Sequence, residues 1–141
     1  MTPRVPRGTP EGGQFAEGRK PEGTELRPAV RLATMPENVG GYGFNHAGAL
    51  KVLGTRNVLA ISGGRVLIIS DETRKPVGMA LPVSQGYSVH IYLTNEDDYT
   101  VQRIFRGKIK GEVEGVLDES LAQVSLDASA YASKDFGDFG D

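Results

Sequence analysis

The chain has 141 residues, which suits one compact domain, and its 16 basic and 18 acidic residues give a formal net charge of −2. It contains no cysteine, which excludes a disulfide framework, a thiolate metal site and a cysteine nucleophile. A charge so close to neutral excludes polyanion binding by overall charge, so a nucleic-acid site would need a local basic patch.

The first 25 residues are rich in proline and glycine, and Val5 and Phe15 are almost the only side chains there that could pack. Such a segment cannot offset its ordering entropy, so the composition predicts a disordered leader over residues 1–25. Gly12-Gly13-Gln14 is similar to the tripeptide with which peptide-chain release factors hydrolyse peptidyl-tRNA. In those factors the tripeptide lies on a loop of a folded, basic domain. Because the motif stands in an unstructured arm here, we do not expect a hydrolase.

A single domain is expected over residues 26–133. A short helix is predicted over residues 45–53. Two apolar runs, residues 57–61 and 66–69, then flank Gly63-Gly64. Two glycines between β-branched runs are typical of a β-hairpin, because both accept positive φ angles. Since both faces of this hairpin would be apolar, we expect it to lie centrally in the sheet.

Further strands are predicted over residues 77–81, 86–94, 99–106 and 109–116. The segment 86–94 alternates apolar and polar residues, as a half-buried antiparallel strand does. A C-terminal helix capped by Asp118 follows, with an apolar stripe formed by Leu117, Leu121, Val124, Ala128 and Tyr131. Residues 134–141 form an acidic aromatic tail without fixed structure. The predicted fold is α+β: a mostly antiparallel sheet or small partly open barrel of about six strands, with a C-terminal helix and flexible ends.

No catalytic constellation is expected. His46 and His90 are far apart in the sequence, and Ser62 precedes a predicted turn rather than a strand-to-helix elbow. The carboxylates of residues 96–98 could hold a divalent cation, but they lack calcium-loop spacing and such loops are usually solvated. We therefore predict a protein that is not an enzyme and uses no cofactor or metal.

Two segments carry a resemblance to a known group of proteins. Residues 4–16, RVPRGTPEGGQFA, resemble the leader of many short proteins of actinobacterial phages and mobile elements. Residues 99–106 and 110–116, YTVQRIFR and KGEVEGV, are similar to a family of small accessory proteins of such phages. Members of that family often have a longer glycine-rich turn after the first of these strands, where this chain has Gly107 alone. The resemblance implies a phage origin and no particular activity.

Binding of a host or phage protein is the favoured function, with counter-defence or host takeover as its purpose. Small β-rich domains commonly bind through an exposed loop or an added strand. Alternation favours a core position for Tyr87 and leaves Tyr92 open. The candidate contact residues are Tyr87, His90, Tyr92, Glu96, Asp97 and Asp98.

Two alternatives stay open. A single-stranded nucleic acid could follow a basic stripe, and the acidic tail resembles those of single-strand-binding proteins. Glu112 and Glu114 interrupt that stripe, whose residues are Arg103, Arg106, Lys108 and Lys110. The protein could also be a minor virion component whose leader threads between subunits. No apolar run spans a bilayer and no signal peptide is evident, so we expect a cytoplasmic location and no membrane partner. The oligomeric state stays open.

Overall fold

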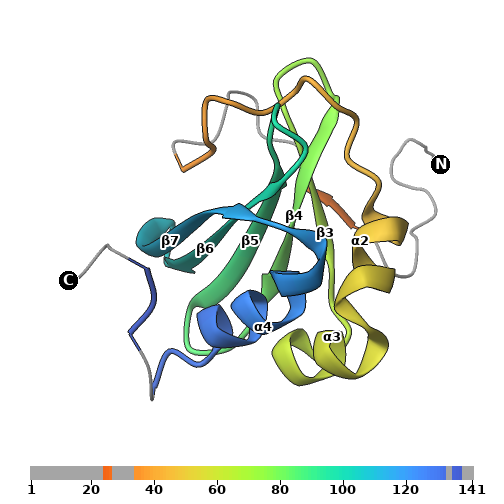
Figure 1. The fold of residues 1–141 in the computed structure, drawn as a ribbon. Helices are drawn as coiled ribbons and strands as arrows, with labels where there is room; N and C mark the ends of the chain where they lie inside the picture. Colours follow the sequence, from red (N-terminus) through yellow and green to blue (C-terminus); the bar gives the residue numbers. More distant parts are fainter. Residues whose placement is uncertain (1–23, 27–33, 133–134, 138–141) are drawn as a thin grey trace, which may run out of the picture.

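The computed structural model describes residues 24–26, 34–132 and 135–137, which form an α+β fold. Figure 1 shows a twisted open sheet with its helices on one face. The six strands lie in chain order: β2 (Thr24–Leu26), β3 (Leu67–Ser70), β4 (Pro76–Pro82), β5 (Tyr87–Leu93), β6 (Tyr99–Phe105) and β7 (Lys108–Val116). β2 pairs with β3 in parallel, whereas every later neighbouring pair is antiparallel. The predicted fold class is confirmed.

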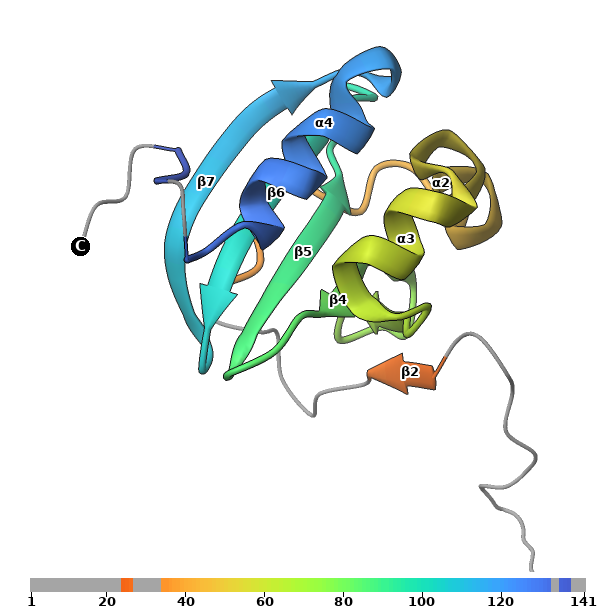
Figure 2. The same cartoon turned by 90° about the horizontal axis from the view of Figure 1, so that it is seen from below.

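Three helices cover one face of the sheet. They are α2 (His46–Leu53), α3 (Thr55–Ser62) and α4 (Asp118–Ser129). Figure 2 shows them together above the strands, with β7 curving around α4. None of the helices in the described ranges is long and apolar enough to cross a membrane.

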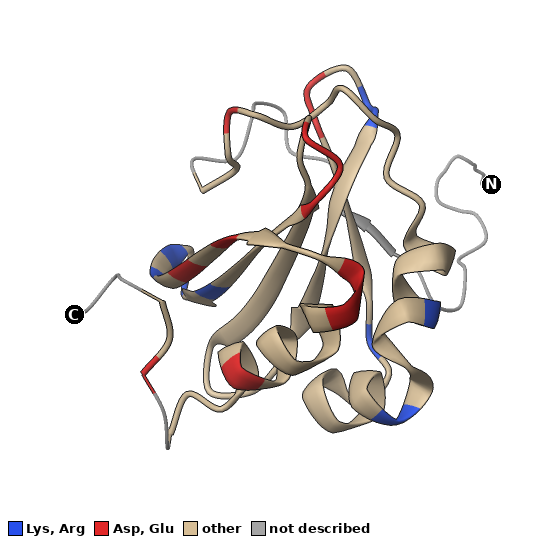
Figure 3. Ribbon diagram, viewed as in Figure 1, with Lys and Arg blue, Asp and Glu red and all other residues tan. Residues whose placement is uncertain are grey.

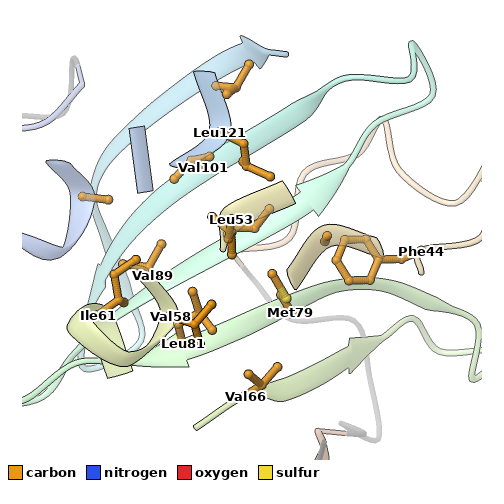
Figure 4. Close-up of a cluster of buried hydrophobic side chains, with 14 of the residues drawn as sticks. Phe44, Leu53, Val58, Ile61, Val66, Met79, Leu81, Val89, Val101 and Leu121 are labelled. Atoms are coloured by element: carbon orange, nitrogen blue, oxygen red, sulfur yellow. The ribbon is translucent and has the colours of Figure 1, made fainter. Parts of the chain in front are cut away.

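The main core lies between these helices and the sheet. Leu53 of α2, Ile61 of α3 and Leu121 of α4 point toward the strands (Figure 4). The sheet contributes residues that alternate along each strand: Met79, Leu81, Val89, Ile91 and Val101. Burying each large apolar side chain contributes about 1.5–3 kcal/mol, so this layer holds the helices in place.

The opposite face of the sheet is also covered. A second cluster there consists of Met35, Ile69, Val77, Ala80 and Tyr92. The segment over residues 34–44 is fastened to this side by Gln102, whose Nε2 donates a 2.8 Å hydrogen bond to the carbonyl of Thr34. The backbone N–H of Asn95 likewise donates to the carbonyl of Asn38 at 2.7 Å. The polar side of β5, the strand predicted over residues 86–94, is therefore buried.

The predicted hairpin around Gly63-Gly64 is wrong, because residues 57–61 belong to helix α3. Gly54 and Gly63 bound this helix, and Gly63 ends it in the left-handed conformation with φ 66°. Val58 and Ile61, three residues apart, face the core, whereas Leu59 is 56% exposed. The spacing is helical, and the two glycines supply a helix C-terminus rather than a hairpin turn.

The structure agrees with the predicted position of the first helix and differs from the predicted start of the C-terminal helix. The helix expected over residues 45–53 is confirmed as α2, with the side chain of Asn45 accepting a hydrogen bond from the N–H of Gly48. In α4 the N-cap is Leu117, not Asp118, and Leu117 is 52% exposed instead of joining the buried stripe. The proposed leader boundary at residue 25 falls inside β2, and residues 1–23 lie outside the described part.

The predicted structureless tail is wrong for part of its length. Phe136 is only 6% exposed and belongs to the main core cluster. It lies next to β7, where Gly111 leaves room for it. The tail thus contributes an apolar side chain that the sheet and α4 alone would lack.

Candidate functional site

A cavity of about 430 Å³ opens at one end of the sheet, between α2 and the N-terminal end of α4. We call it the α2–α4 cavity. The end of β5 and the start of β6 form its floor. The residues that line it include Phe44, Val52, Asp97, Tyr99, Leu117, Asp118 and Glu119. The cavity is thus assembled from three segments that are distant in sequence: residues 43–52, 93–99 and 117–119.

The turn between β5 and β6 positions one acidic wall. The backbone N–H of Thr94 donates to the carbonyl of Asp98 at 2.8 Å, and Thr94 Oγ1 donates to the Asp98 carboxylate at 2.5 Å. Asp97 adopts a left-handed backbone with φ 63°, which short polar residues tolerate better than others. Asp98 is therefore turned back toward the strand, and Asp97 is left to line the cavity.

The opposite wall is shaped by the glycine-rich segment before α2. Asn95 Oδ1 accepts a 2.5 Å hydrogen bond from the N–H of Gly41, and a Cβ at Gly41 would overlap that amide. The N–H of Phe44 donates to the carbonyl of Pro76 at 3.1 Å, which fixes the entry to α2. Phe44 is buried and forms an apolar wall of the cavity.

The cavity is electrostatically negative. Its lining includes Asp97, Asp118 and Glu119 and no lysine or arginine. Figure 3 shows acidic residues on the loops around this end of the sheet and at the start of α4. The pKa of the Tyr99 hydroxyl is raised, first by burial and then by the charges of Asp118 and Asp97. The cavity therefore disfavours an additional negative charge and favours a cation.

Exposed apolar side chains border the same cavity. Val52 is 36% and Leu117 is 52% exposed, and both line it. Apolar groups beside carboxylates suit a ligand that has an apolar stem and a cationic tip. Phe44 and Tyr99 add aromatic surface, which also attracts cations.

The predicted partner-binding residues are separated by the fold. Tyr87 is half-buried and its ring stacks on Tyr131 with centroids 4.0 Å apart. His90 and Tyr92 lie on the sheet face opposite the helices and are 8% and 0% exposed, so neither offers a contact surface here. Glu96 is exposed, and Asp97 is the predicted residue that lines the α2–α4 cavity.

The histidines do not form a catalytic pair. His46 begins α2 on the helical side of the sheet, whereas His90 is buried on the other side, where burial lowers its pKa to about 4. Ser62 donates its hydroxyl to the carbonyl of Arg65 at 2.7 Å and is buried at the end of α3. Within the described residues, no three metal-binding side chains come together.

The predicted basic stripe is not continuous. Arg103 is 6% exposed and its guanidinium donates to the carbonyls of Ala128 and Asp127 at the end of α4. Arg106 and Lys108 are exposed near the β6–β7 turn, and Lys110 is partly buried. Without Arg103, the exposed part of the stripe is confined to this turn.

The α2–α4 cavity combines residues that the sequence pattern did not group. Leu117 was predicted to belong to the apolar stripe of the C-terminal helix, and nothing in the pattern joined it to Val52 and Glu119, because this grouping depends on how α2 and α4 meet. The described residues thus offer one cavity with charge, aromatic surface and exposed apolar groups together. No protein family, curated protein or solved structure matches the chain.

Proposed function

We propose that this protein is a non-enzymatic accessory protein of a phage or mobile element, which binds a host or phage protein in the host cytoplasm. The α2–α4 cavity is its binding surface. The supporting observation is that the cavity unites three carboxylates with exposed apolar side chains and contains no basic residue. This combination is suited to recognition of a side chain with an apolar stem and a cationic tip.

The partner presents a lysine or arginine side chain to the cavity. Its aliphatic stem packs against Val52 and Leu117, and its charged end reaches Asp118 and Glu119. The aromatic ring of Tyr99 adds a cation–π contact. A volume of about 430 Å³ lies within the range of about 300–1,000 Å³ that is common for ligand pockets, and it holds one long side chain with part of its backbone.

A pair of matched double variants tests this proposal. Asp118→Asn/Glu119→Gln removes two charges from the cavity. Glu37→Gln/Glu114→Gln removes the same number of charges from exposed positions that do not line it. Each variant and the wild type are titrated with N-acetyl-lysine methylamide and followed by backbone NMR, and each is used for affinity capture from nuclease-treated host lysate.

The expected result is that the lysine probe shifts the amides of Tyr99, Leu117 and Asp118 in the wild type and the control variant. These shifts are lost in the cavity variant. A specific captured protein is likewise retained by the control and lost by the cavity variant, and its capture weakens with salt. Shifts spread evenly over surface carboxylates, or equal capture by all three proteins, would contradict the proposal.

A further inference from the structure

Near its C-terminal end the chain folds back, and a short segment packs against the edge strand β7. Residues 135–137, with the sequence Asp-Phe-Gly, lie against Gly111 and Glu112 of β7. Phe136 is 6% exposed and packs in the main core. The neighbouring residues of β6 and β7 restrict which side chains fit at positions 136 and 137.

Gly111 makes room for the bound backbone. It lies opposite Arg103 in the β6–β7 register, on the sheet face that the helices cover. A Cβ at Gly111 would overlap the carbonyl oxygen of Phe136 and approach its ring to 2.9 Å. Any larger residue at this position of β7 would therefore exclude the segment.

Arg103 provides a cation for the phenylalanine ring. Its guanidinium carbon lies 5.5 Å from the centroid of Phe136, within the distance of a cation–π interaction. Hydrogen bonds of 2.7 Å to Ala128 and 2.9 Å to Asp127 hold the guanidinium in this position. Burial lowers the pKa of Arg103, and the electrostatic effects of Tyr87 and the Asp135 carboxylate partly oppose this shift.

The position after the phenylalanine accepts only glycine. The φ of Gly137 is +68°, and a Cβ there would overlap the backbone of Glu112. A residue with a side chain would be strained and would collide with β7. The contacts thus select a phenylalanine followed directly by a glycine. We call Arg103, Gly111 and the backbone of Glu112 the Asp-Phe-Gly seat.

We propose that the Asp-Phe-Gly seat is a peptide-binding site for an Asp-Phe-Gly segment of a partner protein, and that residues 135–137 occupy it as an intramolecular competitor. The sequence repeats the same tripeptide at residues 138–140, which lie outside the described part of the chain. The seat is separate from the α2–α4 cavity, so the two proposals stand independently.

Competition with the tethered tail sets the expected affinity pattern. A short linker gives an intramolecular segment an effective concentration of the order of mM. A free peptide of the same chemistry must displace that segment, so its apparent affinity is reduced to the fraction of molecules whose seat the tail leaves empty. Emptying the seat removes this competition, so the same peptide should bind more tightly.

The test uses the full chain with Phe136→Ala/Phe139→Ala, which removes both phenylalanines of the repeated tripeptide. The probe is fluorescein-labelled Ser-Lys-Asp-Phe-Gly-Asp, and its binding is measured by fluorescence anisotropy. We expect the double variant to bind at least about tenfold more tightly than the wild type. Phe139→Ala alone is the matched control, because Phe136 still fills the seat, and it should behave as the wild type. Probes with Phe→Ala or Gly→Ala should not bind.

Equal binding by the wild type and the double variant, or absence of binding by a folded double variant, would overturn the proposal. Circular dichroism and a cooperative thermal transition establish that the variant is folded. If the double variant is not folded, hydrogen exchange measured on the wild-type chain provides the test. Excess unlabelled peptide should then speed exchange at the amides of Asp135 to Gly137, and the Phe→Ala peptide should not. Unchanged exchange with both peptides would refute the seat.

Discussion

The Nε atom of Arg103 donates a 2.7 Å hydrogen bond to the carbonyl oxygen of Ala128. This contact joins the interior strand β6 to the last turn of α4, where the carbonyl of Asp127 also accepts a 3.2 Å hydrogen bond from the N–H of Ala130. A positive charge at a helix C-terminus is also favoured by the helix dipole. Arg103 is therefore a structural residue that fastens the helix to the sheet, although its charge suggested a surface role.

Replacement of Arg103 by methionine should lower the free energy of unfolding by at least about 2 kcal/mol, because two hydrogen bonds from a charged group are lost and the carbonyl of Ala128 loses its Arg103 donor. Urea denaturation provides the measurement. Lys108→Met, which removes a charge from an exposed position of the neighbouring strand, should change stability by less than about 0.5 kcal/mol. Similar losses for both variants would show that charge alone matters.

Gly78→Ala should destabilise the sheet by about 1 to 3 kcal/mol, since an added methyl group overfills a packed region. A Cβ at Gly78 would overlap the carbonyl of Ile91 and come within 2.8 Å of the ring of Tyr92. Gly43→Ala is the matched control, because nothing lies within 4 Å of its added Cβ. Thermal unfolding of both variants checks this prediction. An equal melting temperature for the two would contradict the packing argument.

Much of the fold could be predicted from periodicity, and the exceptions have a common cause. The alternating strand β5 and helix α2, with its Asn45 cap, were predictable because local pattern and tertiary packing agree there. Helix α3 was missed because its β-branched residues and the following glycines also suit a hairpin. Propensity is a weak guide when packing against a sheet decides the outcome.

The candidate site was less predictable than the fold. Asp97 stood out because it belongs to an acidic loop, but its neighbours in the cavity come from distant segments. His90 and Tyr92 were candidate contact residues because strand alternation identifies two faces of a sheet without showing what covers them. The segment over residues 34–44 covers the sheet face opposite the helices, where Met35 packs and the carbonyl of Thr34 accepts a hydrogen bond from Gln102.

Asp118→Asn should lower the pKa of the Tyr99 hydroxyl toward its ordinary value, because the carboxylate of Asp118 is the larger of two charges that raise it. Asp97→Asn should have a smaller effect in the same direction. The titration can be followed by NMR with tyrosine labelled at Cζ. Glu114→Gln, at an exposed position outside the cavity, serves as the control. An unchanged pKa in Asp118→Asn would refute the negative potential on which cation binding depends.

Burial of His90 should make the protein less stable in mild acid. Its pKa falls from 6.5 to about 4 in the folded state, so the unfolded chain binds the additional proton between these values. The stabilisation is complete above pH 6.5 and is lost as the pH falls toward 4, at a total cost of about 3 kcal/mol. The Tyr92 hydroxyl, 3.4 Å from His90 Nδ1, supplies no charge that would retain the proton.

Denaturation of the wild type and His90→Gln from pH 7.5 to 4 isolates this contribution, since carboxylates titrate in both proteins and cancel in the difference. The variant should lose less stability than the wild type over this interval. His46→Gln is the matched control, because His46 is only partly buried at the start of α2, and it should follow the wild type. Parallel curves for the wild type and His90→Gln would mean that His90 takes up its proton without unfolding, and the sheet face around Tyr92 would then have to admit water.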